Sequence, residues 1–234
     1  MRFEELNWME MESYLKHDDR VILVTGACEQ HAYLSLLTDI KIPLAMADAV
    51  SQKSGVLVAP PLNYGCSSSF MDFPGTISLQ STTIMAVIED VVLSLYHHGF
   101  RRILVLNGHG GNRAMRSRLS ELTSEIDDLR VIWYEWFNSG RVKTIVDRLG
   151  IPDEHASWIE SFPFTRTTQV IPDGSKEVVP HGAELLSATR QRKLIDDGNY
   201  GGPYQVDDAI MDEIFDTCVA ETLELIEFPD PLEK

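Results

Sequence analysis

The chain is poor in cysteine and in long apolar runs. Its three cysteines, Cys28, Cys66 and Cys218, are too few and too scattered for a disulfide framework or for a zinc site built on thiolates. No uninterrupted apolar run approaches the roughly 18 residues that a membrane-spanning helix needs. The N-terminus is acidic and mixed, unlike a signal or transit peptide. These absences predict a soluble, cytoplasmic protein with no membrane partner.

Positive charge is also scarce, because 20 Lys and Arg residues stand against 36 Asp and Glu residues, for a formal net charge of −16. A surface this acidic repels phosphate backbones and anionic lipid, so we expect no nucleic-acid partner. What remains is an ordinary globular composition, with 234 residues of which 44% are hydrophobic. This length can bury a sizeable core, and we expect residues 1–234 to form a single domain.

Short apolar runs alternate with helical patterns along the chain. The runs are continuous rather than alternating, which is typical of strands buried on both faces of a parallel sheet; they cover residues 21–25, 56–59, 103–106 and 131–134. Apolar residues at helical spacing predict helices between and after them, over residues 43–54, 82–98, 112–126 and 206–228. Pro43 is expected in the first turn of its helix, and Asn112 is expected to cap the third. The alternation predicts a three-layer α/β/α sandwich with a mostly parallel sheet.

The first polar segment that follows a predicted strand contains Glu29, His31 and, further on, Asp39. Glu29 and His31 are two residues apart, so both side chains point to the same side of an extended segment. Ligands of open α/β sheets bind beyond the carboxyl ends of the strands, where these residues lie. Two carboxylates and an imidazole there could hold Zn²⁺, Mn²⁺ or Fe²⁺. Taken alone, however, the pattern is better explained as ordinary polar loop residues.

The second segment, Asn107–Asn112, places His109 among glycines directly after the third predicted strand. One interpretation is a glycine-rich anion loop at a helix N-terminus. The segment lacks the G-x-G-x-x-G pattern and the lysine of a P-loop, so nucleotide binding has little support. The other interpretation is a metal ligand held rigidly by its neighbours, and the histidine inside the glycine cluster favours it.

The third segment contains His155 and Glu160, which are five residues apart and do not share a helix face. By themselves they are typical of solvated surface residues, although a turn could aim both at one centre. All three segments follow strands of one predicted sheet and therefore lie at one edge. Crowding these histidines and carboxylates together is costly without a cation, so the segments jointly favour a metal site.

The order of these motifs resembles the creatininase (creatinine amidohydrolase) family over about residues 20–205. The matching segments are Thr25–His31 with Leu37–Asp39, Phe73–Thr76, Asn107–Asn112 and His155–Ser161. The resemblance implies a three-layer sandwich and a centre of two divalent metal ions, Zn, Mn or Fe. It also implies a homo-oligomer, often a hexamer. The implied activity is hydrolysis of a non-peptide C–N bond in a small cyclic amide or formamide.

The resemblance also implies roles for individual residues. Four of them match the family's metal ligands: Glu29, His31, Asp39 and His109. Asp39 would bridge the two ions, and His155 matches the catalytic histidine. Creatininase has a glutamate two residues after the histidine of its Asn-Gly-His motif, where this chain has Gly111. In relatives with Asn-Gly-His-Gly-Gly-Asn, the glutamate of the His-Ala-x-x-x-Glu segment can reach the metal, so the resemblance implies Glu160 as the fifth ligand.

These assignments predict a mechanism in which a metal-bound hydroxide attacks a carbonyl. The backbone N–H groups of Gly110 and Gly111 would stabilise the oxyanion. His155 would act first as a base and then as the acid that protonates the leaving nitrogen. Trp158, with Trp133 and Trp136, could wall a pocket for a small planar substrate, although Trp133 fits the core equally well.

Departures from the family pattern bear on the substrate. The stretch from Glu29 to Asp39 is one residue shorter than usual and lacks a second histidine, and Phe70 stands where the family often has histidine. These changes lie near the expected substrate and argue against creatinine. Two other functions stay open: hydrolysis of a cyclic ketone or sugar derivative on the same ligands, and a non-catalytic anion-binding protein built on Gly110 and Gly111. The latter predicts no bound metal.

Overall fold

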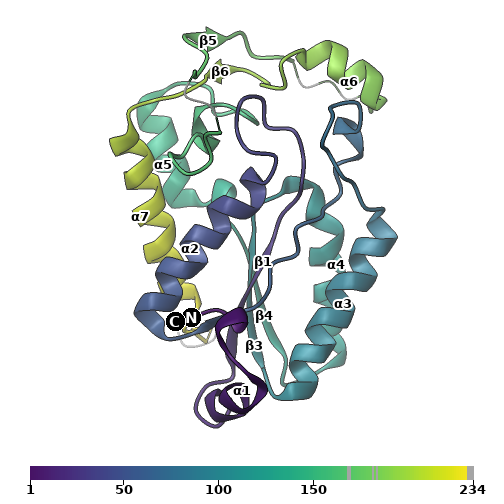
Figure 1. Cartoon of the computed structure of the whole chain (residues 1–234), viewed down its shortest axis with the longest axis vertical. Helices are drawn as coiled ribbons and strands as arrows, with labels where there is room; N and C mark the ends of the chain where they lie inside the picture. The colour runs from purple at the N-terminus through teal and green to yellow at the C-terminus, as the bar shows by residue number, and fades with distance from the viewer. Residues whose placement is uncertain (168–169, 181, 183, 231–234) are drawn as a thin grey trace.

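A parallel four-stranded sheet forms the centre of the molecule (Figure 1). The computed structural model describes residues 1–167, 170–180, 182 and 184–230. Within them the strand order is β2-β1-β3-β4, with all three pairings parallel. The strands are β1 (Arg20–Thr25), β2 (Leu57–Val58), β3 (Arg102–Asn107) and β4 (Arg130–Glu135). All four strands predicted from apolar runs are therefore confirmed.

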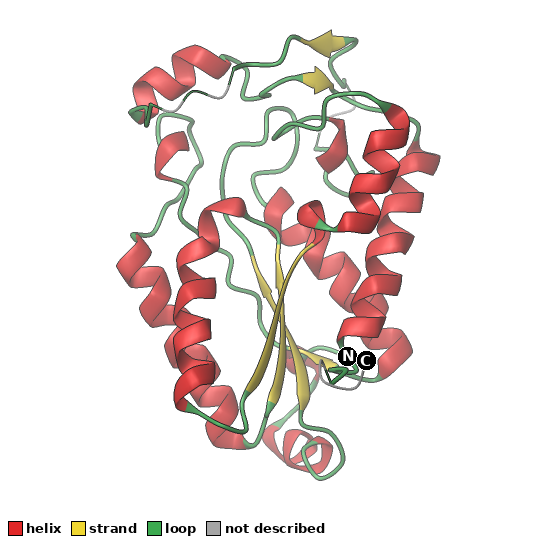
Figure 2. Ribbon diagram, turned by 180° about the vertical axis from the view of Figure 1, so that it is seen from behind, coloured by secondary structure: helices red, strands yellow, loops and turns green. Residues whose placement is uncertain are grey.

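Helices cover both faces of this sheet (Figures 1 and 2). One layer consists of α2 (Thr38–Ser54), α5 (Gly140–Leu149) and α7 (Asp208–Leu225), and the other of α3 (Ser81–His98) and α4 (Arg113–Glu125). The alternation of strand side chains explains the two cores. In β1, Ile22 and Val24 pack in the cluster with α2, while Val21 and Leu23 pack in the cluster with α3. The predicted three-layer sandwich is confirmed.

Smaller elements complete the chain. The short helix α1 (Trp8–Tyr14) lies at the end of the sheet where β1 begins (Figure 1). Above the opposite end lie α6 (Ala188–Ile195) and the antiparallel pair β5 (Ser175–Lys176) and β6 (Gly202–Pro203). We call these three elements the upper layer. They cover the edge where the parallel strands end, which is where the polar motifs lie.

Helix α2 differs from its prediction, because it begins at Thr38 and contains Pro43 in its interior. Proline has no N–H, so Pro43 cannot donate the usual helical hydrogen bond to the carbonyl of Asp39. Two strand ends pack closely on that same carbonyl. A Cβ atom at Gly26 or Gly108 would lie 2.3 or 2.0 Å from the Asp39 oxygen. This packing brings the first turn of α2, and with it Asp39, against the carboxyl ends of β1 and β3.

Across the described part of the chain, no helix combines the length and the apolar character needed to cross a membrane.

Candidate metal centre

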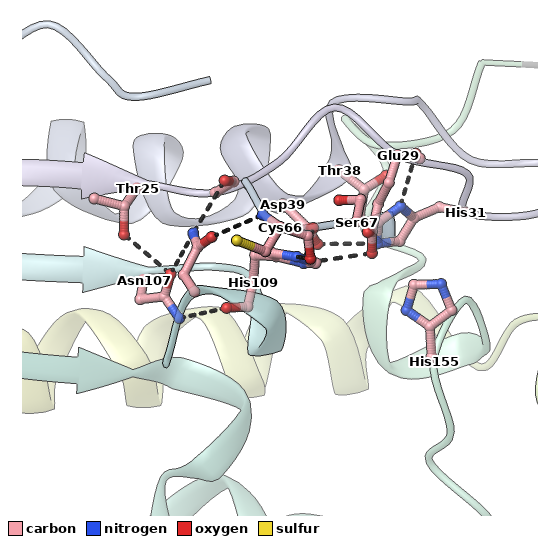
Figure 3. Close-up of polar contacts among 12 residues, drawn as sticks. Thr25, Glu29, His31, Thr38, Asp39, Cys66, Ser67, Asn107, His109 and His155 are labelled. Carbon is pink, nitrogen blue, oxygen red and sulfur yellow. Dashed lines mark hydrogen bonds and ion pairs between the residues drawn. The ribbon is translucent and has the colours of Figure 1, made fainter. Parts of the chain in front are cut away.

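A network of polar side chains joins the ends of β1 and β3 (Figure 3). Thr25 and Asn107 are neighbours in the strand register, and the Thr25 hydroxyl donates to Asn107 Oδ1 at 3.0 Å. The Asn107 amide donates in turn to the carbonyl of His109 at 2.7 Å and to Glu135 Oε1 at 3.1 Å. The loops that follow the two strands are therefore fixed relative to each other.

Two groups of ligand-type side chains meet at this edge and share Asp39. In what we call the His109 group, His109 Nδ1 lies 2.9 Å from Asp39 Oδ2 and 3.4 Å from Glu29 Oε1. In the His31 group, His31 Nε2 lies 2.9 Å from Asp39 Oδ1 and 3.7 Å from Glu160 Oε1. Each oxygen of Asp39 thus faces a different histidine. The structure brings together all five residues that the sequence nominated as metal ligands.

The second nitrogen of each ring is held by the backbone. His109 Nε2 donates to the carbonyl of Cys66 at 2.9 Å, and His31 Nδ1 donates to the carbonyl of Glu29 at 3.2 Å. These bonds fix the ring orientations and aim the remaining nitrogens at the carboxylates. Histidine ligands of protein metal sites are usually held in this way.

The charges of the centre interact strongly. Burial lowers the pKa of His31, but attraction by Asp39 and Glu160 outweighs it, so the pKa lies well above its usual range. The pKa of His109 is also raised well above its usual range, because attraction by Glu29 and Asp39 outweighs the effect of burial. Burial alone would raise the pKa of Asp39, yet the two histidines hold it below its usual value. Without other cations the centre therefore retains protons to balance its carboxylates.

Glu29 Oε2 has no hydrogen-bond partner among the described residues, and His31 Nε2 and Asp39 Oδ2 have only the histidine–carboxylate contacts given above. The three residues are at most 3% exposed, so water does not solvate them freely. Buried polar atoms without partners are costly, and groups of this kind are usually paired or bound to metal. Carboxylate oxygens and imidazole nitrogens are common donors to divalent transition metals. The residues present therefore fit a divalent metal centre.

A strained turn places Glu160. Ala156 has a left-handed backbone with φ of 58°, which is uncommon for a residue other than glycine. Its N–H donates to Glu160 Oε2 at 2.6 Å, while Oε1 faces His31. Residues Trp158–Glu160 form a 3₁₀ turn. This turn aims both His155 and Glu160 at the centre, as the sequence allowed.

His155 lies beside the His31 group and contacts two rings. Its ring centroid is 4.5 Å from that of His31, which is tilted by 50°, and it stacks on Phe70 at 4.9 Å and 10°. Burial and then the neighbouring charge of His31 lower the pKa of His155, so the ring is neutral at pH 7. Phe70 thus lies next to the centre, stacked on His155.

A cavity of about 420 Å³ opens onto these groups. Beyond the ligand groups, its wall consists of two glycines and five larger residues: Gly108, Gly110, Phe137, Asn138, Asp153, Glu154 and Ile159. His155 also lines it. Any substrate in this cavity would lie against both ligand groups.

Three sequence interpretations need correction. Trp158 does not wall the cavity, because it is not among the described residues that line it. It is fully buried in the core beside α7, and its indole N–H donates to the Pro152 carbonyl at 2.7 Å. Gly111 is also outside this lining, and it packs against His109, where a Cβ would lie 2.3 Å from Nε2. Asn112 makes no side-chain cap; its amide donates to the Gly26 carbonyl and to Asn107, both at 3.1 Å.

Sequence reasoning missed two residues that organise the centre. The Cys66 carbonyl orients His109, but a backbone acceptor leaves no signal in the sequence. Gln30 lies 3.1 Å from His155, through their Nε2 atoms. Its position between Glu29 and His31 was the available signal.

The family model described as creatinine amidohydrolase matches residues 4–226. The chain belongs to the creatininase family. This confirms the resemblance predicted from the motifs. Among solved structures, the chain is similar to a crystal structure of creatinine amidohydrolase (creatininase), with a TM-score of 0.83 and 23% identity over 98% of each chain. That likeness confirms the fold.

Curated relatives within the family differ in their named activities. The chain is 30% identical to creatinine amidohydrolase of Pseudomonas putida, over 66% of this chain and 64% of that protein. It is 35% identical to a mycofactocin precursor peptide peptidase of Mycolicibacterium smegmatis, over 39% and 40%. It is 28% identical to 3-dehydro-scyllo-inosose hydrolase of Thermotoga maritima, over 46% and 35%. The matches thus span from about one third to just under two thirds of the length of these relatives.

Proposed function

We propose that this member of the creatininase family is a metal-dependent hydrolase that cleaves a C–N bond of a small molecule. The observation that carries the proposal is the sharing of Asp39 between the His109 group and the His31 group, with one oxygen 2.9 Å from each histidine. A carboxylate in this position can bridge two cations. We therefore propose two divalent ions, Zn, Mn or Fe, with Glu29 and His109 on one side of Asp39 and His31 and Glu160 on the other.

Such ions would polarise a carbonyl and lower the pKa of a bound water. The protein's own residues supply the remaining functions. Gly110 lines the cavity next to His109, and we propose its backbone N–H as a donor to the developing oxyanion. Gly111 was assigned the same function from the sequence, but its packing supports a different one, which is to leave room for His109 and its acceptor.

His155 is proposed to act on the leaving nitrogen, as the group that donates a proton to it. It lines the cavity beside Glu160, and its lowered pKa keeps the ring neutral, so that one ring nitrogen carries a hydrogen that it can donate. The Phe70 ring stacks on His155, and the His31 ring lies tilted beside it. These contacts hold the His155 ring in place at the cavity.

The cavity wall bears on the substrate. Five of its side chains are carboxylates, namely Glu29, Asp39, Asp153, Glu154 and Glu160, and no Lys or Arg occurs in the lining that the structure describes. This charge argues against the anion-binding alternative. It favours a neutral or cationic small molecule, and we propose a cyclic amide or formamide.

The proposal is tested by an activity screen on metal-reconstituted protein. Cyclic amides and formamides are the expected substrates, while short peptides and inosose derivatives represent the named activities of relatives. Product analysis by mass spectrometry distinguishes C–N cleavage from C–C or C–O cleavage. The Asp39→Asn protein serves as the background control. Cleavage of inosose derivatives alone would favour the cyclic-ketone or sugar alternative. A protein that takes up no metal on reconstitution and turns over none of these substrates would contradict both enzyme hypotheses.

We also propose a homo-oligomer, of which a hexamer is one form. Exposed apolar side chains surround a second cavity beside the Glu29 loop: Leu36, Tyr64 and Ile77 are between 39% and 49% exposed. Light scattering should give a mass well above 26.4 kDa at moderate salt. A clean monomer across a wide concentration range would contradict this. The cytoplasmic location stays a prediction.

A further inference from the structure

Gln30, the middle residue of the Glu-Gln-His segment, has no role in either ligand group, yet its side chain is only 5% exposed. Its Nε2 lies 3.1 Å from His155 Nε2 and 3.1 Å from the carbonyl of Gly198. Its Oε1 accepts the N–H of Ala32 at 3.1 Å. The amide of Gln30 therefore connects the loop after β1 with the turn that carries His155 and with the loop between α6 and β6.

These contacts fix which end of the amide faces His155. If the amide were flipped, its oxygen would face the Gly198 carbonyl and its NH₂ would face the Ala32 N–H, so two hydrogen bonds would become two repulsions. The space around the amide is also closed. A Cβ atom at Gly198, which has a left-handed backbone with φ of 98°, would lie 1.9 Å from Gln30 Oε1. The side chain is consequently held with its NH₂ toward both acceptors.

An amide NH₂ can only donate, so His155 Nε2 must be the acceptor. Among the described residues, the one acceptor that a hydrogen on His155 Nε2 could reach is the backbone carbonyl of Gln30, at the longer distance of 3.3 Å, and this hydrogen would collide with the amide hydrogens. In a neutral imidazole one nitrogen accepts and the other carries the hydrogen. With Nε2 as the acceptor, the hydrogen lies on Nδ1. Among the described residues no hydrogen bond to Nδ1 is formed, so this N–H is available on a ring that lines the cavity.

We propose that Gln30 is a positioning residue that sets the tautomer of His155, so that the ring presents an Nδ1–H donor to the cavity. The proposal also decides between alternative metal groupings. His155 lies close enough to Glu29 and His31 to form a third possible ligand group. With its Nε2 lone pair engaged by Gln30 and its Nδ1 protonated, His155 has no lone pair for a metal. It is therefore held apart from the ligands. The tautomer does not depend on the proposed hydrolysis, whereas the use of this N–H toward the leaving nitrogen does.

The test is ¹⁵N NMR of the histidine rings in uniformly labelled protein, with His155 assigned by the loss of its signals in His155→Asn. We expect an unprotonated Nε2 and a protonated Nδ1, both after chelator treatment and after loading with Zn²⁺. A wild-type ring protonated on Nε2 would overturn the proposal without any variant. So would a displacement of the His155 nitrogen signals by Zn²⁺ of the kind that a coordinated ring shows. Failure to bind Zn²⁺ with the Nδ1–H tautomer intact would instead contradict the proposed function.

Variants test whether Gln30 is the cause. Gln30→Met keeps the length and removes the donor, so the His155 signals should shift toward a mixture of tautomers. Gln30→Glu can only accept and should move the hydrogen to Nε2. Gln191→Met is the matched control, because Gln191 is a glutamine of the upper layer, 8% exposed, that donates to Tyr200 rather than to His155. Wild-type signals in both Gln30 variants, or an equal shift in the control, would overturn the assignment.

Discussion

Replacing Asp39 with Asn removes the one side chain that both ligand groups share. Asp39 Oδ1 and Oδ2 each lie 2.9 Å from a histidine nitrogen of a different group. Asparagine keeps the size, but it loses the negative charge, and its NH₂ donates hydrogen bonds and cannot hold a cation. We therefore expect Asp39→Asn to lose both ions, whereas Glu29→Gln, which alters the His109 group alone, should retain about one.

The size of the effect follows from ligand linkage. At free metal about 1,000-fold above the dissociation constant, each site stabilises the folded protein by about 4 kcal/mol. For a domain of this size, 1 kcal/mol corresponds to roughly 2–4 °C in Tm, so each site should raise Tm by roughly 8–16 °C. The wild type should show the sum of two such shifts between chelator and Zn²⁺ or Mn²⁺, and Asp39→Asn should show little or none.

The assay pairs thermal melting with elemental analysis after gel filtration. Each variant is compared with itself in chelator, so that changes in the stability of the metal-free protein cancel. Asp153→Asn is the matched control, because Asp153 lines the same cavity outside both ligand groups and should keep both ions. Full metal content and a full shift in Asp39→Asn would refute the bridging role. Equal loss in Asp153→Asn would show that the effect is not specific to the shared carboxylate.

Three further predictions concern neighbouring residues. His155→Ala should keep both ions and lose roughly 10²–10⁴-fold in turnover, which corresponds to about 3–5 kcal/mol of barrier. Metal content and kcat on the substrate found in the screen measure the two effects, and loss of metal would make His155 a ligand. Gly111→Ala should displace His109 and leave about one ion, because its Cβ would lie 2.2 Å from the Cys66 carbonyl, whereas Gly110→Ala, with open space, should keep two. Metal affinity should rise with pH, because the pKa values of His31 and His109 are raised and metal binding must displace their protons. Calorimetry in buffers of different ionisation enthalpy should detect this proton release. Its absence would count against the assignment of both histidines as metal ligands.

Much of the fold could be predicted because each layer leaves a local pattern. The strands contain continuous apolar runs, and helices such as α3 carry a clear apolar stripe. The start of α2 could not be predicted, because Pro43 suggested a first turn. Its true place depends on Gly26 and Gly108 packing against the Asp39 carbonyl, which is a contact between distant segments.

The candidate site was predictable in its residue types but not in its internal support. Carboxylates and histidines after buried strands mark the edge of the sheet, and motif order supplied Glu160. The Cys66 carbonyl that orients His109, and the Ala156 N–H that holds Glu160, are backbone groups with no sequence signature. Trp158 was misassigned because an aromatic residue between two site residues fits a pocket wall and a core equally well.

The central claim is that Asp39 bridges two ions held by the His109 and His31 groups. The most direct test is an anomalous-difference map from a crystal of the protein loaded with Zn²⁺ or Mn²⁺, collected at the absorption edge of the metal. We predict two peaks per chain roughly 3.5–4 Å apart, one beside Glu29 and His109 and one beside His31 and Glu160, with Asp39 between them. A single peak, or a peak whose ligand is His155 instead of Glu160, would contradict the account.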